Sequence, residues 1–181
     1  MNTNAYIPPD HYDLIKRRLR KADQALCDLL LLTGFRVSDL LKARNYQVDS
    51  VYISLYEAKT GKRRTVATSP EIRRALSSYR RYTHQNEEFG GRNPLACAFV
   101  SERGRKGDRA HLSRTTIYRR FAKAVYMAGL AEKGYSLHSL RKCYAVNLYE
   151  KSGSLLVVQR DLGHSSMSTT CLYVFGSRAT L

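Results

Sequence analysis

The sequence lacks any long apolar run. A membrane-spanning helix needs about 18 or more consecutive apolar residues, and no such stretch occurs. The first ten residues, Met1–Asp10, are polar, include two prolines and contain no apolar segment of the kind found in signal peptides. We therefore expect a cytoplasmic protein without a membrane partner.

Cysteine and acidic residues are also sparse. The four cysteines are widely spaced and form no C-x-x-C pair, which argues against a zinc site and against a disulfide framework. The 15 acidic residues form no paired-carboxylate motif, which disfavours a nuclease that uses two metal ions. We expect no metal and no other cofactor.

Positive charge is abundant. Lys and Arg number 31 against 15 acidic residues, so the formal net charge is +16. The basic residues form short clusters along the whole chain, whereas a disordered basic tail would gather them at one end. Such clusters on folded elements fit a surface that follows a phosphate backbone. The alternative is a basic protein with no nucleic-acid partner.

Apolar periodicity and capping residues predict a mainly helical chain. A length of 181 residues with 43% hydrophobic content is enough for one compact core. Gly34 ends one predicted helix, and Ser69 and Ser113 each begin another. The predicted helices cover about residues 10–20, 25–33, 38–43, 70–82, 113–128, 139–151, 154–162 and 168–175.

A period of two interrupts the helical pattern early in the chain. Val51, Ile53 and Leu55 alternate with other residues, and a second apolar segment follows Gly61, which predicts a β-hairpin. We expect Ala96–Ser101 to add an edge strand, followed by a basic loop at Arg103–Arg109. The fold class is therefore expected to be mainly α with a small three-stranded antiparallel β-sheet.

Two basic residues in the first half of the chain lie where predicted elements end or turn. Arg36 follows a helix-ending glycine and an aromatic residue in the segment Thr33–Leu41, from which its side chain can reach a cleft. Lys59 lies near the hairpin tip, where it can reach a DNA groove and deliver a proton. Each has an ordinary alternative: a solvated surface arginine, and a lysine that protects a sheet edge.

Two further segments lie in the last third. His138 and Arg141 are three residues apart on a predicted helix, so both can converge on one phosphate oxygen. His164 and Tyr173 flank the start of the last helix with a polar connection between them. An H-x-x-R pair is common by chance, and a buried core tyrosine is the ordinary interpretation in a chain with 13 tyrosines.

Together and in order, these segments resemble the catalytic domain of the tyrosine recombinases, the phage-integrase family. The resemblance covers about residues 25–174, and Asp39 stands where Glu is commoner in the family. The nine-residue step from His164 to Tyr173 matches the usual spacing of the family. The positions that match the family pattern are Arg36, Lys59, His138, Arg141, His164 and Tyr173.

The resemblance implies a recombinase that cleaves and rejoins DNA through a 3′-phosphotyrosine. Tyr173 would be the nucleophile, Lys59 the general acid for the departing 5′ oxygen, and His138 would help to take the Tyr173 proton or orient the phosphate. The charge clamp on the phosphate would come from the remaining matched residues, which are Arg36, Arg141 and His164.

The resemblance also implies partners and a setting. We expect double-stranded DNA, a homo-tetramer on two DNA sites, accessory proteins that bend DNA, and a nucleoid-associated protein of a bacterium, phage or mobile element. Most members carry a further N-terminal domain, whereas we expect residues 1–181 to form a single catalytic domain with a lead-in at 1–20. Only eight residues follow Tyr173, where relatives often use a longer tail to contact a neighbouring protomer.

Two other functions use the same residues differently. A nicking-closing enzyme of the type IB topoisomerase kind would share the whole pocket. A DNA-binding regulator that does not recombine would have no need for it, and the six matched residues therefore argue against that alternative.

Overall fold

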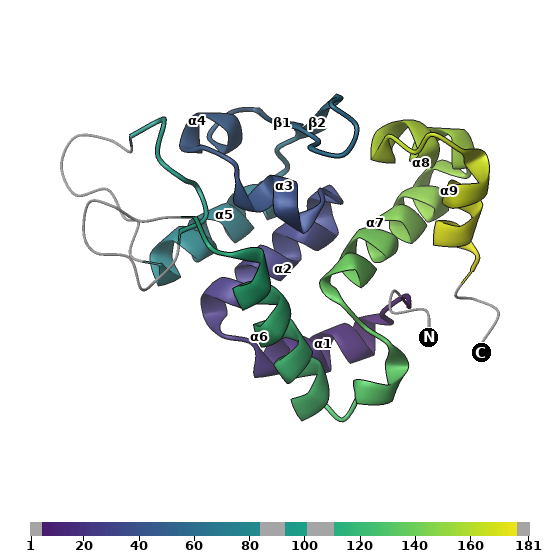
Figure 1. The fold of residues 1–181 in the computed structure, drawn as a ribbon, viewed down its shortest axis with the longest axis horizontal. Coiled ribbons are helices and arrows are strands. Elements are labelled where there is room, and N and C mark those ends of the chain that lie inside the picture. The colour runs from purple at the N-terminus through teal and green to yellow at the C-terminus, as the bar shows by residue number, and fades with distance from the viewer. Residues whose placement is uncertain (1–4, 84–92, 101–110, 177–181) are drawn as a thin grey trace.

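The computed structural model describes residues 5–83, 93–100 and 111–176 (Figure 1). The predicted basic loop Arg103–Arg109 lies outside these residues. The strands are β1 (Tyr52–Tyr56) and β2 (Arg63–Ala67), and the helices are α1 (Pro9–Arg18), α2 (Lys21–Thr33), α3 (Val37–Leu41), α4 (Asn45–Val48), α5 (Pro70–Tyr82), α6 (Arg114–Met127), η1 (Ala131–Lys133, a 3-10 helix), α7 (Leu137–Ser152), α8 (Leu155–Leu162) and α9 (Met167–Val174).

The main core surrounds α2. This helix is apolar on most of its circumference, with Leu26, Leu29 and Leu30 all fully buried, as expected for a helix inside a protein rather than on its surface. It packs against α5 and α7, while α1 and α6 pack against each other (Figure 1). The first half of α7 belongs to this core through Leu137 and Leu140.

A second, smaller core holds the C-terminal helices together. Ala145 of α7 packs with Val158 and Leu162 of α8 and Val174 of α9. Figure 1 shows α8 and α9 gathered at the far end of α7. The long helix α7 therefore connects the two cores, and it carries the C-terminal pair of helices away from the main body.

The hairpin has the alternation that the sequence predicts. Ile53 pairs with Val66 and Leu55 with Arg64 in an antiparallel register, and both apolar residues of β1 are buried. Tyr52 and Tyr56, one position out of step, are exposed. One face of the hairpin thus lies against the body of the protein.

The predicted third strand is wrong. The described part of the segment, Ala96–Val100, makes two isolated bridges, one between Arg44 and Cys97 and one between Val100 and His111. Its backbone groups pair with residues 43–45 and 112 instead of the hairpin. Within the described ranges the sheet therefore has two strands.

The helix predictions are otherwise confirmed with small shifts of the ends. Ser69 and Ser113 cap α5 and α6, and each hydroxyl accepts a hydrogen bond from the backbone three residues later. The short helices α4 and η1 were not predicted, because elements of three or four residues leave no periodicity to read. No helix in the described part of the chain is long and apolar enough to cross a membrane.

Gly34 forms the corner between α2 and α3. Its φ of 62° lies in the left-handed region, and a Cβ atom built on it would lie 2.3 Å from the ring of Tyr144 on α7. Only glycine avoids both the conformational cost and the clash. The corner can therefore press directly against α7.

We predict that Gly34→Ala lowers the free energy of unfolding by about 3 kcal/mol, from left-handed strain plus overpacking. Gly153→Ala is the matched control: φ there is 64°, but nothing lies within 4 Å of the added carbon. It should cost only about 1 kcal/mol. Urea denaturation of both variants measures the difference, and equal losses would contradict the role of the Tyr144 contact.

Candidate active site

Arg36 lies at the N-terminus of α3, immediately after the Gly34 corner. Its Nη1 atom is 2.5 Å from Oε1 of Glu57 in the β1–β2 turn and 4.0 Å from Oδ2 of Asp39. The guanidinium is partly exposed, whereas both carboxylates are buried. Two buried carboxylates, from α3 and from the hairpin turn, therefore hold the partly exposed guanidinium of Arg36.

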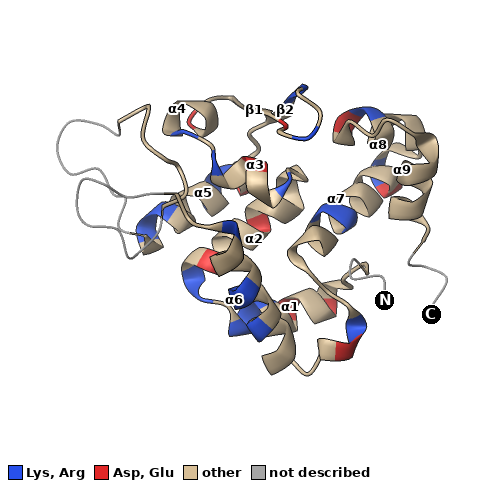
Figure 2. Cartoon of the chain, in the orientation of Figure 1, with Lys and Arg blue, Asp and Glu red and all other residues tan. Residues whose placement is uncertain are grey.

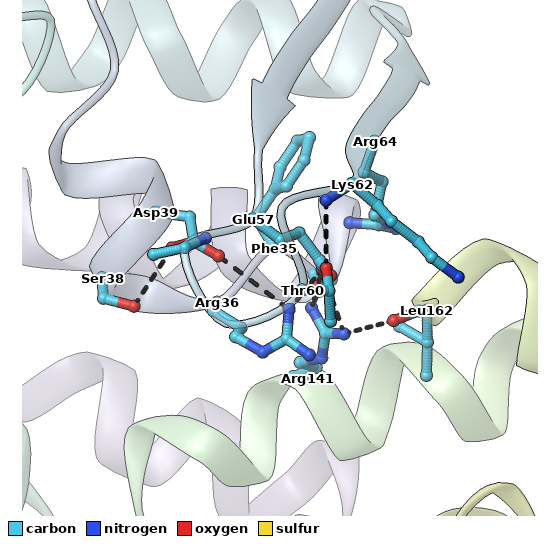
Figure 3. A network of polar contacts seen from close by, with 12 residues as sticks. Phe35, Arg36, Ser38, Asp39, Glu57, Thr60, Lys62, Arg64, Arg141 and Leu162 are labelled. Carbon is cyan, nitrogen blue, oxygen red and sulfur yellow. Dashed lines mark hydrogen bonds and ion pairs between the residues drawn. The ribbon is translucent and has the colours of Figure 1, made fainter. Parts of the chain in front are cut away.

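Arg141 lies in the first part of α7 with only 2% of its surface exposed. Nη1 donates to the carbonyl of Gly34 and Nη2 to the carbonyl of Leu162, each at 2.7 Å, and both atoms lie 3.4 Å from Oε1 of Glu57 (Figure 3). Burial, and then the charges of Arg36 and Arg64, lower the pKa of Arg141 to about 10, so the group stays charged at neutral pH.

Glu57 is the acceptor that joins the two arginines, and the sequence reasoning missed it. Its side chain is 1% exposed, and Oε2 accepts a hydrogen bond from Thr60 Oγ1 at 3.0 Å. Burial alone would raise the pKa of Glu57, but the Arg36 hydrogen bond and the charge of Arg141 outweigh it and lower the pKa. A signal existed, since Ile53, Leu55 and Glu57 share the inward face at period two.

His138, His164 and Tyr173 form a second group of contacting side chains. Nε2 of His138 on α7 is in short contact with the hydroxyl of Tyr173 on α9. His164, which follows α8, holds Thr170 through Nδ1 at 3.1 Å. The ring centroids of His138 and His164 lie 5.6 and 4.8 Å from that of Tyr173, both edge-on. The structure thus brings these three predicted residues together.

The protonation states of these groups follow from their surroundings. Burial, and then the charges of Arg141 and Arg36, lower the pKa of His138 and of His164 to about 4 each, so both rings are neutral near pH 7. Burial raises the pKa of Tyr173 while the same two arginines pull it down. A neutral His138 beside a protonated Tyr173 is placed to accept the phenol proton.

Lys59 is exposed in the β1–β2 turn. It makes no described hydrogen bond or ion pair with the other five predicted residues, although its positive charge contributes to the lowered pKa of His138. The structure therefore places Lys59 at the margin of the group rather than inside it.

A second buried arginine, Arg64 of β2, was also missed. Nη2 donates to the carbonyl of Thr33 and to Oδ2 of Asp161, each at 2.7 Å. Its guanidinium carbon lies 4.7 Å from the ring centroid of Phe35 and 5.4 Å from that of Tyr144. Arg64 thereby fastens the hairpin to α2 and to the end of α8, and the sequence shows it only as one member of a basic cluster.

Basic residues also lie outside this group. Figure 2 shows Lys and Arg on α5, on α6 and around the hairpin turn, on several sides of the molecule. Among the residues that the structure describes, no group of three or more His, Cys, Asp or Glu side chains is placed to hold a metal ion.

Comparison with known proteins identifies the family. The sequence model described as the phage integrase family matches residues 9–177. The chain belongs to this family. Tyrosine recombinase XerD of Pseudomonas putida is 32% identical over 174 residues, covering 96% of this chain and 54% of that protein. Tyrosine recombinase XerC of Alcanivorax borkumensis is 31% identical over 154 residues, covering 83% and 47%. The chain spans about half the length of the curated relatives it matches.

Solved structures show the same fold. The lambda integrase tetramer bound to a Holliday junction gives a TM-score of 0.77 at 23% identity, covering 98% of this chain and 49% of that one. XerA recombinase gives 0.72 at 24% identity, covering 94% and 58%. The predicted resemblance and fold class are confirmed, apart from the third strand.

We predict that acidification between about pH 6.5 and 4 destabilises the protein, because unfolded histidines take up protons that folded His138 and His164 do not. With solvent screening allowed for, the loss from pH 7 to 5 should be about 1 kcal/mol per histidine. Urea denaturation at both pH values should show a smaller loss in the double variant His138→Gln, His164→Gln. The control is His111→Gln, at an exposed histidine. Equal losses in wild type, the double variant and this control would contradict the role of His138 and His164 in the pH dependence.

Proposed function

We propose that this integrase is a site-specific DNA recombinase that cleaves and rejoins strands through a 3′-phosphotyrosine. The observation that carries the proposal is the contact between His138 Nε2 and the Tyr173 hydroxyl, beside two guanidinium groups that converge on one carboxylate oxygen. In this proposal Tyr173 is the nucleophile, His138 the proton acceptor and the arginine pair the anion site, which are the groups that phosphoryl transfer requires.

The cleavage step follows from these positions. The Tyr173 oxygen attacks the phosphorus and passes its proton to His138, while the bond from phosphorus to the 5′ oxygen breaks. Lys59, on the turn, gives a proton to that oxygen, which leaves as a 5′ hydroxyl. The phosphate stays joined to Tyr173, so the bond energy is kept and a 5′ hydroxyl can reverse the step without ATP.

Binding of the DNA phosphate would change the pKa of His138. Arg36 and Arg141 stabilise the charge on its non-bridging oxygens, and His164 donates a further hydrogen bond. In the free protein burial, and then the charges of the two arginines, keep both histidines neutral. A bound phosphate would offset those charges and raise the pKa of His138, which makes it a better acceptor for the Tyr173 proton.

The partners that we propose are double-stranded DNA, further copies of this chain and DNA-bending accessory proteins. The solved relatives include lambda integrase as a tetramer on a Holliday junction and XerH bound to its difH substrate. The net charge of +16 supports a polyanionic partner. We propose that residues 1–181 act as the catalytic domain in a homo-tetramer on two sites, in association with the nucleoid.

We predict that Tyr173→Phe abolishes covalent attachment to DNA while DNA binding persists, because only the attacking oxygen is removed. The substrates are nicked duplexes built on sequences that the protein enriches from random-sequence DNA, incubated without metal. A denaturing gel reports the adduct as a shifted band. Tyr126→Phe, at an exposed tyrosine of α6, should keep the band. A band of undiminished strength from Tyr173→Phe would refute the nucleophile assignment.

A further inference from the structure

One residue outside the six predicted ones lies where the two arginines meet. Oε1 of Glu57 is 2.5 Å from Nη1 of Arg36 and 3.4 Å from both terminal nitrogens of Arg141, so it sits on the fork of that guanidinium (Figure 3). The arginines come from α3 and α7, and Glu57 Oε1 is an ion-pair partner that they share. This oxygen therefore sets the distance between the two guanidinium groups.

The second carboxylate oxygen and the backbone carbonyl of Glu57 hold the β1–β2 turn. Oε2 accepts the hydroxyl proton of Thr60 at 3.0 Å, and the Glu57 carbonyl accepts from the backbone N–H groups of Thr60 and Gly61 at 3.2 and 2.9 Å. Lys59 lies inside this closed turn, between Glu57 and Thr60. Glu57 thus connects the arginine pair with the short segment that carries the lysine.

Loss of the Glu57 carboxylate would be costly for the arginine pair. Both Glu57 and Arg141 are almost fully buried, and removing one partner of a buried ion pair leaves an uncompensated charge. Without the carboxylate, two like-charged guanidinium groups would repel each other across a region with little water. They would then move apart.

We propose that Glu57 is a positioning residue for the reaction proposed above, on which this inference rests. One carboxylate oxygen holds Arg36 and Arg141 at a fixed separation, and the other holds the turn that carries Lys59. The phosphate clamp and the proton donor are thereby placed relative to each other by a single side chain.

Two substitutions separate the two halves of this role. Glu57→Gln keeps the shape and an oxygen that can accept from Thr60, but it removes the negative charge between the arginines. Thr60→Val keeps the shape of its side chain and leaves the arginine pair on Glu57, but it removes the hydroxyl that ties the turn. Glu71→Gln, at an exposed glutamate of α5, is the control for the loss of one charge.

Two DNA substrates that differ at the scissile bond then distinguish misplaced arginines from a misplaced Lys59. In the first duplex the leaving atom is the ordinary 5′ oxygen, which needs a proton as it departs. In the second a sulfur atom replaces it, and a thiolate leaves without a proton because thiols are far more acidic than alcohols. The sulfur substitution should therefore restore the cleavage rate when only Lys59 is misplaced. It should not restore the rate when the two arginines are misplaced.

The rate of adduct formation on the duplex that wild type cleaves is the measurement. Glu57→Gln should slow attachment about 10- to 100-fold on both duplexes, as expected for misplaced charge donors. Thr60→Val should be slow on the oxygen duplex and return to the wild-type rate on the sulfur duplex. Glu71→Gln should match wild type on both, and urea denaturation confirms that each variant is folded.

Three results would overturn the role of Glu57 while the proposed function stands, and a fourth would overturn both. Wild-type rates from Glu57→Gln on both duplexes would remove its role altogether. Full rescue of Glu57→Gln by sulfur would show that it acts only through the turn, and failure of sulfur to rescue Thr60→Val would show that the turn is not held through Glu57. If wild type forms no adduct on either duplex, the proposed function itself fails, and this inference fails with it.

Discussion

Arg141 keeps a positive charge although only 2% of the residue is exposed. Hydrogen-bond acceptors from three separate segments of the chain offset the cost of burying that charge. The carbonyls of Gly34 and Leu162 come from the α2–α3 corner and the end of α8, and the carboxylate of Glu57 comes from the hairpin turn. These segments cannot shift independently without exposing an unpaired charge. The corner that carries Arg36, the turn that carries Lys59 and the helix end before His164 are therefore fixed by one guanidinium group.

The two-core arrangement explains why such polar ties matter. Tyr173 belongs to the small unit of α8 and α9, whose buried residues contact α7 but form a cluster separate from the main core. Besides α7, the ties between that unit and the main body include the hydrogen bonds of Arg141 to Leu162 and of Arg64 to Asp161. Hydrogen bonds are directional, so they fix orientation more sharply than apolar contact does.

The sequence predicts elements where periodicity is long and fails where it is short. The buried helix α2 and the helices α5 and α6 follow from patterns over 13 or 14 residues, and Ser69 and Ser113 mark where the latter two begin. Ala96–Val100 looks like a strand because it is short and apolar, yet its hydrogen bonds go to residues 43–45 and 112. Glu57 and Arg64 escaped notice because a charged residue in a hairpin is ordinarily exposed, and their partners lie far away in sequence.

The sequence by itself determined the order and chemistry of the six matched residues, because a family pattern depends on residue type and spacing alone. It also determined the helical class and the excess of positive charge. Only the tertiary structure decided that His138 meets Tyr173, that Lys59 stands at the margin, and that Glu57 lies between the arginines. The physical reason is that the cost of burying a charge depends on which partners the folded chain brings within reach, and spacing along the chain does not record that distance.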